Sequence, residues 1–405
     1  MTVEEIKRNI LDDPMDRLPI EMRNKFKNSE PFIDIHTHIF TLNDVPSKFL
    51  GIRIPMSRRF IGGLSGVINK FSGKKNRDDM KGIDYFLTTM KDRSSNAIYR
   101  RMNKVYYLDK HPDAIYGILT MDMTQGIDGG SHNSIWTQFS TVAMIRNLNP
   151  DKIIPFACID PRRDKAMDLF EQMFNSKMPY KYFGLKVYPS LGYLPTHPTL
   201  MKMLEVCAAK GIPVLTHCSS GSTHGSLKRK DNVPGTFVND KGEHIQNADF
   251  KTRVLHRKDD YRDFFNRPQN WEPVLEKFPN LKLNIAHFGG DVAWEDYLNG
   301  KNTKWIDTIL GFIDKYDNVY ADFSYTLYSQ RYSKALKKMM AKNEKLASRT
   351  LFGSDYYMLV IEDNYKTIFE RFKKDMGPEV MKRIAVDNNR EYLIGPFDTS
   401  KSSAT

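Results

Sequence analysis

Phe32-Ile33-Asp34-Ile35-His36-Thr37-His38 is an apolar run that ends in two histidines separated by one residue. Such a run, rich in aromatic and β-branched residues, predicts a short buried strand. Because side chains alternate between the two faces of a strand, His36 and His38 point the same way and can hold one metal ion between them. Asp34 lies on the same face one layer deeper, where we expect it to orient a ligand rather than to bind the ion.

Four later apolar runs also end in a polar residue that could serve a metal or a substrate. They are residues 183–186, 213–217, 283–287 and 351–355, which end in Lys186, His217, His287 and Asp355. A (β/α)8 barrel keeps its chemistry at the carboxyl ends of its strands. The recurrence of this pattern therefore predicts one shared site built by several strands.

Alternation of strands and helices along the chain supports the same fold. Eight β-rich segments are predicted strands, near residues 31–36, 115–121, 153–160, 182–188, 213–217, 282–287, 319–323 and 350–354. Helical periodicity fills most of the intervals, for example at residues 199–210, 271–278, 305–316 and 332–347. Strands that alternate with helices predict βαβ units and a parallel sheet, and a count of eight favours closure into a barrel.

Three kinds of segment depart from the minimal barrel repeat. Residues 1–30 are predicted to form a helical extension, residues 31–395 the barrel, and residues 396–405 a polar tail. Long insertions follow the first strand, at residues 41–114, and the fifth, at residues 218–270. Both insertions leave the strand ends that carry the candidate ligands, so we expect them to cap the site.

The candidate site residues differ in how many roles they allow. His217 is a predicted metal ligand, and Cys218 next to it should point away from the barrel axis. His287 can bind the metal, or it can hydrogen-bond the substrate and a bound water. Asp355 can act as a ligand, as a general base, or as both. Lys186 can carry a CO2 adduct that bridges two ions, contact an anionic substrate, or extend to solvent at the barrel rim.

Four further residues are candidates for substrate binding. Tyr188, Arg162 and Arg163 also lie at strand ends. The arginines suit a carboxylate or phosphate, and rim salt bridges are the alternative. His224 joins this group because it follows His217 closely in the sequence.

Composition limits the partners and the compartment. The chain has 405 residues and a net charge of +12, which we attribute first to a lysine-rich surface and second to an anionic substrate. The sequence has no zinc-finger or RNA-binding motif, so no nucleic-acid partner is expected. No apolar run reaches the ~18 residues of a membrane helix. The charged amino terminus lacks a signal-peptide core, and three cysteines cannot form a disulfide framework, so we expect a cytoplasmic protein.

These motifs together resemble the amidohydrolase superfamily, in particular its branch related to aminocarboxymuconate semialdehyde decarboxylase. The resemblance covers roughly residues 31–395, and it includes residues 159–163, 286–290, 352–355 and 389–393. It implies a distorted (β/α)8 barrel with metal ligands His36, His38, His217 and Asp355. It places His287 beside a metal-bound water and favours one divalent ion. Zn is the expected ion, Mn and Fe are alternatives, and a carboxylated Lys186 would imply two ions.

The function expected from these residues is metal-dependent hydrolysis of an amide, lactone or ester bond in a small anionic substrate. Asp355, His287 and Lys186 are the predicted catalytic residues. The first alternative is nonoxidative decarboxylation of an aromatic or unsaturated carboxylic acid. The second is a non-catalytic barrel that binds a ligand or nucleic acid. A small-molecule substrate is the expected partner, no membrane is involved, and a homodimer is kept as an alternative to a single chain.

Overall fold

The computed structural model describes residues 2–46, 48–49, 52–53, 94–108, 111–124, 131–220, 232–239, 241–249 and 263–395. Its main sheet has eight strands, and each of its neighbouring pairs is parallel. In sheet order they are β1 (Ile33–Thr37), β4 (Ile115–Leu119), β5 (Ile153–Cys158), β6 (Gly184–Val187), β7 (Val214–Thr216), β10 (Leu283–Ile285), β11 (Val319–Asp322) and β12 (Thr350–Leu351). All eight predicted strands are confirmed.

The first and last strands close the sheet into a barrel. The Ile35 amide donates to the Phe352 carbonyl over 3.2 Å, and the Asp355 amide donates to the His36 carbonyl over 2.8 Å. A parallel bridge between Thr37 and Tyr356 continues this pairing beyond β12. The predicted (β/α)8 barrel is therefore confirmed, and its seam runs directly through the His-x-His segment.

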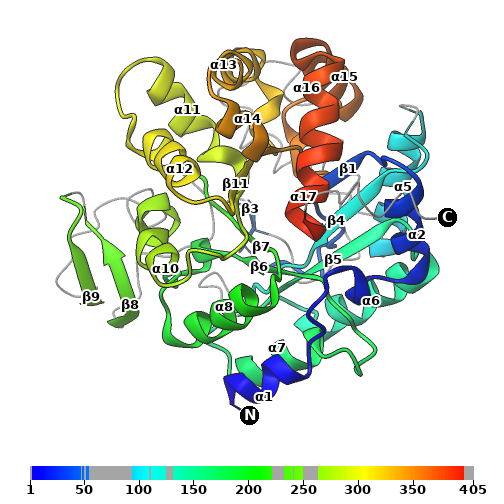
Figure 1. Cartoon of the computed structure of the whole chain (residues 1–405), viewed down its shortest axis with the longest axis vertical. Coiled ribbons are helices and arrows are strands. Elements are labelled where there is room, and N and C mark those ends of the chain that lie inside the picture. The colour runs from blue at the N-terminus through cyan, green and yellow to red at the C-terminus, as the bar shows by residue number, and fades with distance from the viewer. Residues whose placement is uncertain are drawn as a thin grey trace, which may run out of the picture.

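Helices surround the strands, as Figure 1 shows. The α-helices are α1 (Val3–Arg8), α2 (Ile20–Asn28), α5 (Ser95–Leu108), α6 (Ile135–Leu148), α7 (Ala166–Phe174), α8 (Pro198–Lys210), α10 (Glu272–Lys277), α11 (Gly290–Leu298), α12 (Lys304–Lys315), α13 (Gln330–Met340), α14 (Glu344–Arg349), α15 (Tyr365–Met376), α16 (Pro378–Lys382) and α17 (Asn388–Ile394). Apart from α2 and α17, the apolar faces of most of these helices and the outer faces of the strands form one large core.

One helix prediction is wrong. Residues 332–347 are not a single helix, because α13 ends at Met340 and α14 begins at Glu344. The Asn343 side chain accepts from the Leu346 amide and so caps the start of α14. An asparagine favours such a cap over a helix interior, which explains why the apolar periodicity alone missed the break.

Helix α2 covers the end of the barrel at which the strands begin, here called the lower end. Met22 and Phe26 of α2 are fully buried and share a core cluster with the interior residues Ile33 and Phe156. The Tyr392 hydroxyl of α17 donates to the Val214 carbonyl over 2.8 Å at the same end. This end of the barrel is thus packed with side chains, which leaves the carboxyl ends of the strands for chemistry.

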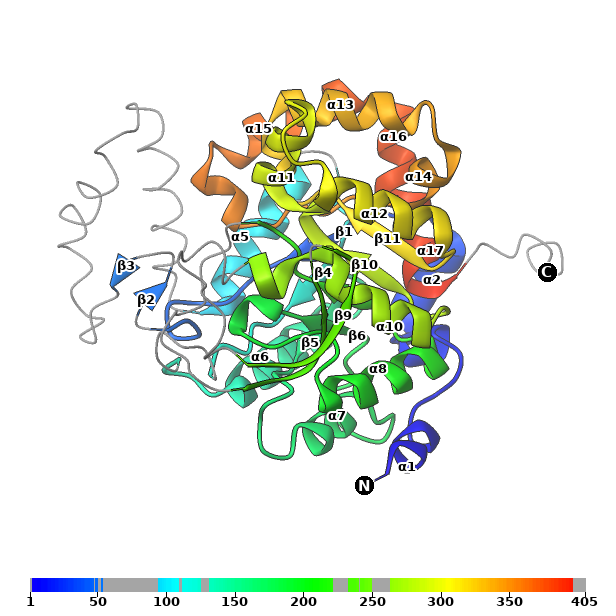
Figure 2. The ribbon, with the colours of Figure 1, turned by 90° about the vertical axis from the view of Figure 1, so that its left-hand side faces the viewer.

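The described parts of the two long insertions contain regular elements. α5 lies in the first, together with a small antiparallel pair, β2 (Lys48–Phe49) and β3 (Ile52–Arg53), which Figure 2 shows to one side of the barrel. The second holds the antiparallel hairpin of β8 (Asn232–Val238) and β9 (His244–Asp249). The remainder of both insertions, and the tail at 396–405, lie outside the described residues, so the cap stays a prediction.

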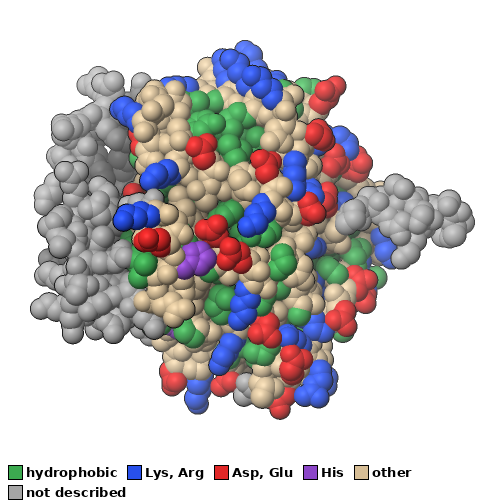
Figure 3. Space-filling view, turned by 60° about the vertical axis from the view of Figure 1, so that its left-hand side comes forward, with side chains coloured by type: hydrophobic (Ala, Val, Ile, Leu, Met, Phe, Trp, Pro, Cys, Tyr) green, Lys and Arg blue, Asp and Glu red, His purple; other side chains and the backbone are tan. Residues whose placement is uncertain are grey.

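The charge distribution on the surface and the hydropathy of the helices concern the predictions about nucleic-acid and membrane partners. On the face drawn in Figure 3, Lys and Arg side chains are interspersed with Asp and Glu rather than separated from them. Within the described residues, no helix is both long and apolar enough to span a membrane.

Candidate metal centre

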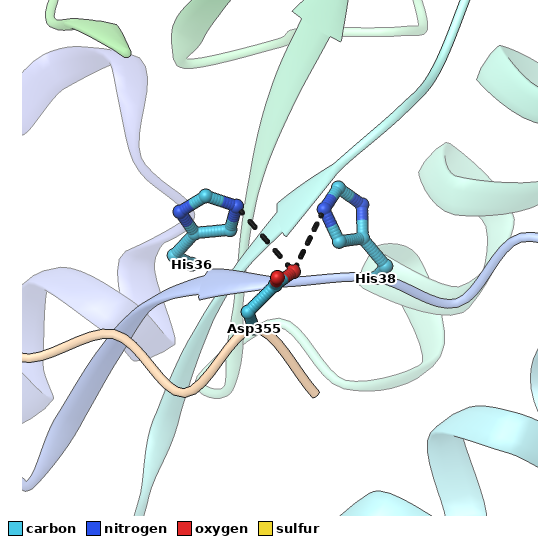
Figure 4. A group of neighbouring side chains, drawn as sticks. All are labelled: His36, His38 and Asp355. Atoms are coloured by element: carbon cyan, nitrogen blue, oxygen red, sulfur yellow. Dashed lines mark ion pairs between the residues drawn. The ribbon is translucent and has the colours of Figure 1, made fainter. Parts of the chain in front are cut away.

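Three of the four predicted metal ligands form one compact cluster at the barrel seam. β1 carries His36, His38 follows it directly, and Asp355 lies just beyond β12. Their donor atoms all lie within 4.8 Å of one another, and all three side chains are buried. Asp355 Oδ1 is 3.3 Å from His38 Nε2 and 3.7 Å from His36 Nε2, so the carboxylate lies between the two imidazoles (Figure 4).

Two possible metal-binding atoms in this cluster are buried without a hydrogen bond. His36 Nε2 and Asp355 Oδ1 have no hydrogen-bond partner in the described structure. Buried polar atoms are nearly always paired, so two orphans that face each other call for a ligand. Burial also lowers the pKa of His36 to about 3, which keeps the imidazole in the neutral form that binds metals. Two imidazole nitrogens and one carboxylate oxygen fit a divalent transition metal.

Asp355 is held ionised by its histidine neighbours. Burial on its own would raise its pKa, but the contacts with His38 and His36 hold the pKa below its usual value. Its backbone has a φ of 56°, in the left-handed region that costs energy for a residue other than glycine. The hydrogen bond from its amide to the His36 carbonyl fixes this geometry. Such strain is typical of residues whose side-chain position matters more than local stability.

Gly353 explains how the chain can approach His36 so closely. A Cβ atom on Gly353 would lie 2.6 Å from the Cβ of His36 and 3.3 Å from that of Ser324. Only a glycine therefore fits between the first and last strands at this level. The glycine of the Phe352-Gly-Ser-Asp355 motif is thus required for the first and last strands to approach each other this closely.

His217 and His287 meet beside the cluster. His287 Nε2 is 3.0 Å from His217 Nδ1, and the ring centroids of His36 and His287 are 4.9 Å apart. His287 is buried, and burial lowers its pKa. The structure thus brings all four predicted ligands and His287 to one end of the barrel, with His217 linked to the cluster through His287. Cys218 donates through its thiol to the Asn266 carbonyl over 3.3 Å, and burial raises its pKa.

Asp322 and Ser324 are site residues that the sequence interpretation missed. Asp322 ends β11, and its Oδ2 atom is 3.1 Å from His36 Nδ1. It also accepts from the His287 amide over 3.0 Å and from Asn284 Nδ2 over 2.8 Å. Burial would raise the pKa of Asp322, but His36 holds it far below its usual value. Because this carboxylate binds Nδ1 of His36, it directs Nε2 toward Asp355.

Ser324 completes this support. Its hydroxyl lies 3.0 Å from His36 Nδ1 and 2.9 Å from His287 Nδ1, and it donates to Asp322. The signal was present in the sequence, because Asp322 lies next to the end of the predicted strand at residues 319–323, close to the position that His217 and His287 occupy in theirs. A polar residue at that position should have been included in the site.

Asp34 orients the backbone rather than an imidazole. Its Oδ1 accepts from the Ser354 amide over 2.8 Å and from the His36 amide over 3.3 Å. The Tyr106 hydroxyl donates to Oδ2. Burial raises the pKa of Asp34 to about 7. Asp34 therefore links the backbone of β1 to that of the segment after β12. The expected direct contact between Asp34 and a ligand side chain is replaced by these contacts with the backbone.

Lys186 and Tyr188 lie at the end of β6, next to the histidines. Lys186 is 1% exposed, and burial lowers its pKa to about 8. Nearby Asp322 and Asp355 act in the opposite direction and favour the charged amine. The Tyr188 ring meets the His217 ring edge-on at a centroid distance of 4.7 Å, and Lys186 Nζ lies 6.0 Å from the centre of the Tyr188 ring.

Both predicted arginines form ion pairs with strand-end aspartates. Arg162 binds Asp160 with an Nη2–Oδ2 distance of 2.5 Å, and Arg163 binds Asp122 with an Nε–Oδ2 distance of 2.5 Å. Their part in substrate binding stays a prediction. His224 lies outside the described residues.

The barrel and its histidine–aspartate cluster define a (β/α)8 protein with a candidate metal centre at the carboxyl ends of its strands. The amidohydrolase family model matches residues 131–393. The chain therefore belongs to the amidohydrolase family, whose members are metal-dependent enzymes. No curated protein matches the sequence.

Several solved structures are similar to this one. A 5-carboxyvanillate decarboxylase from Sphingomonas paucimobilis has 12% identity and a TM-score of 0.49, covering 91% of this chain and 100% of that one. The corresponding enzyme of Novosphingobium aromaticivorans, with bound manganese, has 12% identity and a TM-score of 0.49, covering 91% and 98%. A probable 2-pyrone-4,6-dicarboxylic acid hydrolase from Acinetobacter baumannii has 11% identity and a TM-score of 0.48, covering 89% and 98%. Identities and scores this low transfer neither a substrate nor a reaction.

Proposed function

We propose that this protein is a metal-dependent hydrolase that cleaves an amide, lactone or ester bond of a small anionic substrate. The observation that carries the proposal is the pair of orphaned buried atoms, His36 Nε2 and Asp355 Oδ1, within one ligand cluster. His36, His38 and Asp355 would hold the ion, with His217 as the fourth ligand. We favour one ion and expect Zn, because imidazole and carboxylate donors suit it.

The metal, when bound, supplies Lewis acidity that lowers the pKa of a water and polarises a substrate oxygen. Asp355 has the role of the proton carrier, because it is ionised and buried beside the histidines. It accepts the proton of the attacking water and passes it to the leaving group. His287 is held by Ser324 at Nδ1 and by His217 at Nε2. To polarise the scissile carbonyl, it would take up a proton and turn Nε2 from His217 to the carbonyl oxygen. Lys186 offers a cation to an anionic group of the substrate.

Metal analysis of the purified protein tests the ligand assignment. The protein should carry about one transition-metal ion per chain, and the His36→Ala/His38→Ala double variant should lose most of it. The fold should be retained, since the core is built by other residues, and circular dichroism would verify this. Unchanged metal content in a folded double variant would contradict the assignment.

Nonoxidative decarboxylation is the second candidate, and Lys186 is the observation that favours it. A buried lysine with a lowered pKa at the site suits the carboxylate of an unsaturated or aromatic acid. In that reaction Asp355, which is ionised at rest, would first take up a proton from water and would then deliver it to carbon after CO2 leaves. Both reactions use the same residues, so only the products separate them.

Isotope labelling distinguishes the two candidates. The metal-loaded protein would be incubated with panels of lactones, amides and aromatic acids in 18O-labelled water and, separately, in deuterated water. Hydrolysis places 18O in the product acid, whereas decarboxylation releases CO2 and places deuterium on carbon. CO2 release with carbon-bound deuterium would replace the first proposal by the second. No turnover in any panel by a metal-loaded protein would count against both.

A further inference from the structure

A cavity lies at the opposite end of the barrel from the metal centre. Its volume is about 440 Å³. Its walls come from the segment that covers the lower end of the barrel and from residues that precede β5 and β6. The charged residues that line it are Arg17, Arg23, Arg146, Lys181, Asp16 and Glu21. The lining of the cavity thus contains four basic and two acidic side chains.

Arg146 is buried in this cavity wall without a carboxylate. It is 6% exposed. Its Nη1 donates to the Lys181 carbonyl over 2.8 Å, and its Nη2 donates to Asn147 Oδ1 over 2.8 Å. Its Nε has no hydrogen-bond partner. Both acceptors are neutral, so the charge of Arg146 is not compensated by the described residues.

Arg17 repeats this arrangement from another wall. Its guanidinium lies 5.2 Å from the centre of the Phe183 ring, and its Nη2 donates to the Gly211 carbonyl over 3.3 Å. Nε and Nη1 are buried without a partner. Burial lowers the pKa of Arg17 to about 10. Asp13 and Asp12 act in the opposite direction on the pKa of Arg17, but neither forms an ion pair with it in the described part of the chain. Two separate elements therefore each place a guanidinium without a paired carboxylate at one cavity.

The acidic lining does not neutralise these two groups. Asp16 is paired with Arg23, with an Nη1–Oδ1 distance of 3.2 Å. A buried charge that lacks a counter-ion is costly, and proteins usually supply one. The planar donor fork of arginine matches carboxylate and phosphate oxygens, so the absent counter-ion is best sought among such anions.

We propose that this cavity binds a small anion that carries phosphate or carboxylate groups. The ligand would lie between Arg17 and Arg146, with Arg23 and Lys181 at the rim. Binding there is separate from the reaction at the other end of the barrel. It would stabilise the folded chain by mass action, and it would fix the amino-terminal segment against the strands.

Anion titration of the full-length, metal-loaded protein tests this proposal. Inorganic phosphate and succinate would be added at constant ionic strength, with chloride as the balancing salt. Calorimetry would give the affinity, and thermal unfolding would give the shift in Tm. At least one probe should bind and raise Tm above the chloride value. The two probes distinguish a phosphate-bearing from a carboxylate-bearing ligand.

Variants locate the binding site. Arg17→Gln and Arg146→Gln should each weaken binding at least tenfold, since each removes a charged donor pair. Arg331→Gln is the matched control, because its guanidinium pairs with Glu295 at 2.6 Å outside the cavity, and it should bind like the wild type. Arg23→Gln, at the partly exposed rim, should fold even if the buried variants do not, and should weaken binding severalfold.

Three results would overturn the proposal. The first is a wild-type protein whose Tm and heat signal are the same in phosphate, succinate and chloride. The second is unchanged affinity in Arg17→Gln, Arg146→Gln and Arg23→Gln. The third is an equal loss in the Arg331→Gln control, which would indicate general screening by salt.

Discussion

At the scale of single residues, the site depends on which nitrogen of each histidine is available. Asp322 and Ser324 bind Nδ1 of His36, and the Leu119 carbonyl lies 3.3 Å from Nδ1 of His38. The Nε2 atoms of both rings are thereby left to face Asp355. The supporting contacts thus set the ligand geometry before any ion binds.

Asp322→Asn should weaken metal binding without removing any ligand. The asparagine side chain is neutral, so it would support the His36 imidazole less well than the Asp322 carboxylate does. The affinity for the metal should therefore fall about 10- to 100-fold. Competition with a chelator, followed by elemental analysis, would measure it. Asp317→Asn is the control, because that carboxylate pairs with Lys345 on the surface. Wild-type affinity in Asp322→Asn would show that His36 is oriented by Ser324 alone.

Asp355→Asn should impair turnover far more than substrate binding. It keeps the size and one oxygen but removes the base, so kcat should fall by about 10²- to 10⁴-fold. Steady-state kinetics on the substrate identified by the labelling screen would measure this. Near-normal kcat with metal still bound would move proton transfer to His287 or another residue.

At the scale of elements, the seam between β1 and β12 is the most constrained part of the barrel. β12 pairs only through Thr350 and Leu351 before the chain turns past Gly353 into the left-handed backbone of Asp355. Because the chain leaves the regular strand conformation here, the Asp355 carboxylate lies beyond the end of β12. The chain approaches His36 here more closely than any side chain on Gly353 would allow.

Gly353→Ala should therefore destabilise the protein and disturb the metal centre together. The added Cβ would clash with the Cβ of His36, and overpacking of this kind costs typically about 1–3 kcal/mol. Urea unfolding and metal analysis would report both effects. The control is Gly311→Ala in α12, where a Cβ meets nothing within 4 Å. That change should be neutral or stabilise by up to about 1 kcal/mol.

Strand positions were predictable from the sequence because apolar runs bounded by turns are strong local signals. The His-x-His ends, His287 and Asp355 followed from their place at strand ends. Other features depended on tertiary contacts that no local pattern contains. Rim salt bridges were an alternative for Arg163, but no local pattern identifies its partner Asp122, which lies just beyond β4. The break at Asn343 and the role of Asp322 were local signals that were overlooked.

At the scale of the whole molecule, the two ends of the barrel differ in charge environment. The upper end gathers histidines around Asp355 and Asp322. The lower end holds Lys282, which lies close to Arg17. Burial lowers the pKa of Lys282 to about 8, and Arg17 adds to this shift.

The free energy of unfolding should depend on pH through Lys282. The folded-state pKa is below the ordinary lysine value of 10.5, so the unfolded chain binds more protons between about pH 8 and 10.5. Stability from this group therefore rises with pH across that window, by about 3 kcal/mol in total. Lys282→Met should be more stable than the wild type at pH 7, and the difference should shrink toward pH 10. Urea unfolding of both proteins at several pH values would measure it, and a pH-independent difference would contradict it.

The closed seam has a consequence for how the protein is made. His36 and Asp355 lie more than 300 residues apart in the sequence, yet they share one site. At about 5–20 residues per second, a ribosome delivers Asp355 roughly 15–60 s after His36. During that interval the nascent chain presents two histidines without their carboxylate. Metal loading should thus follow completion of the chain, and an ion acquired then would bind its first and last strands together.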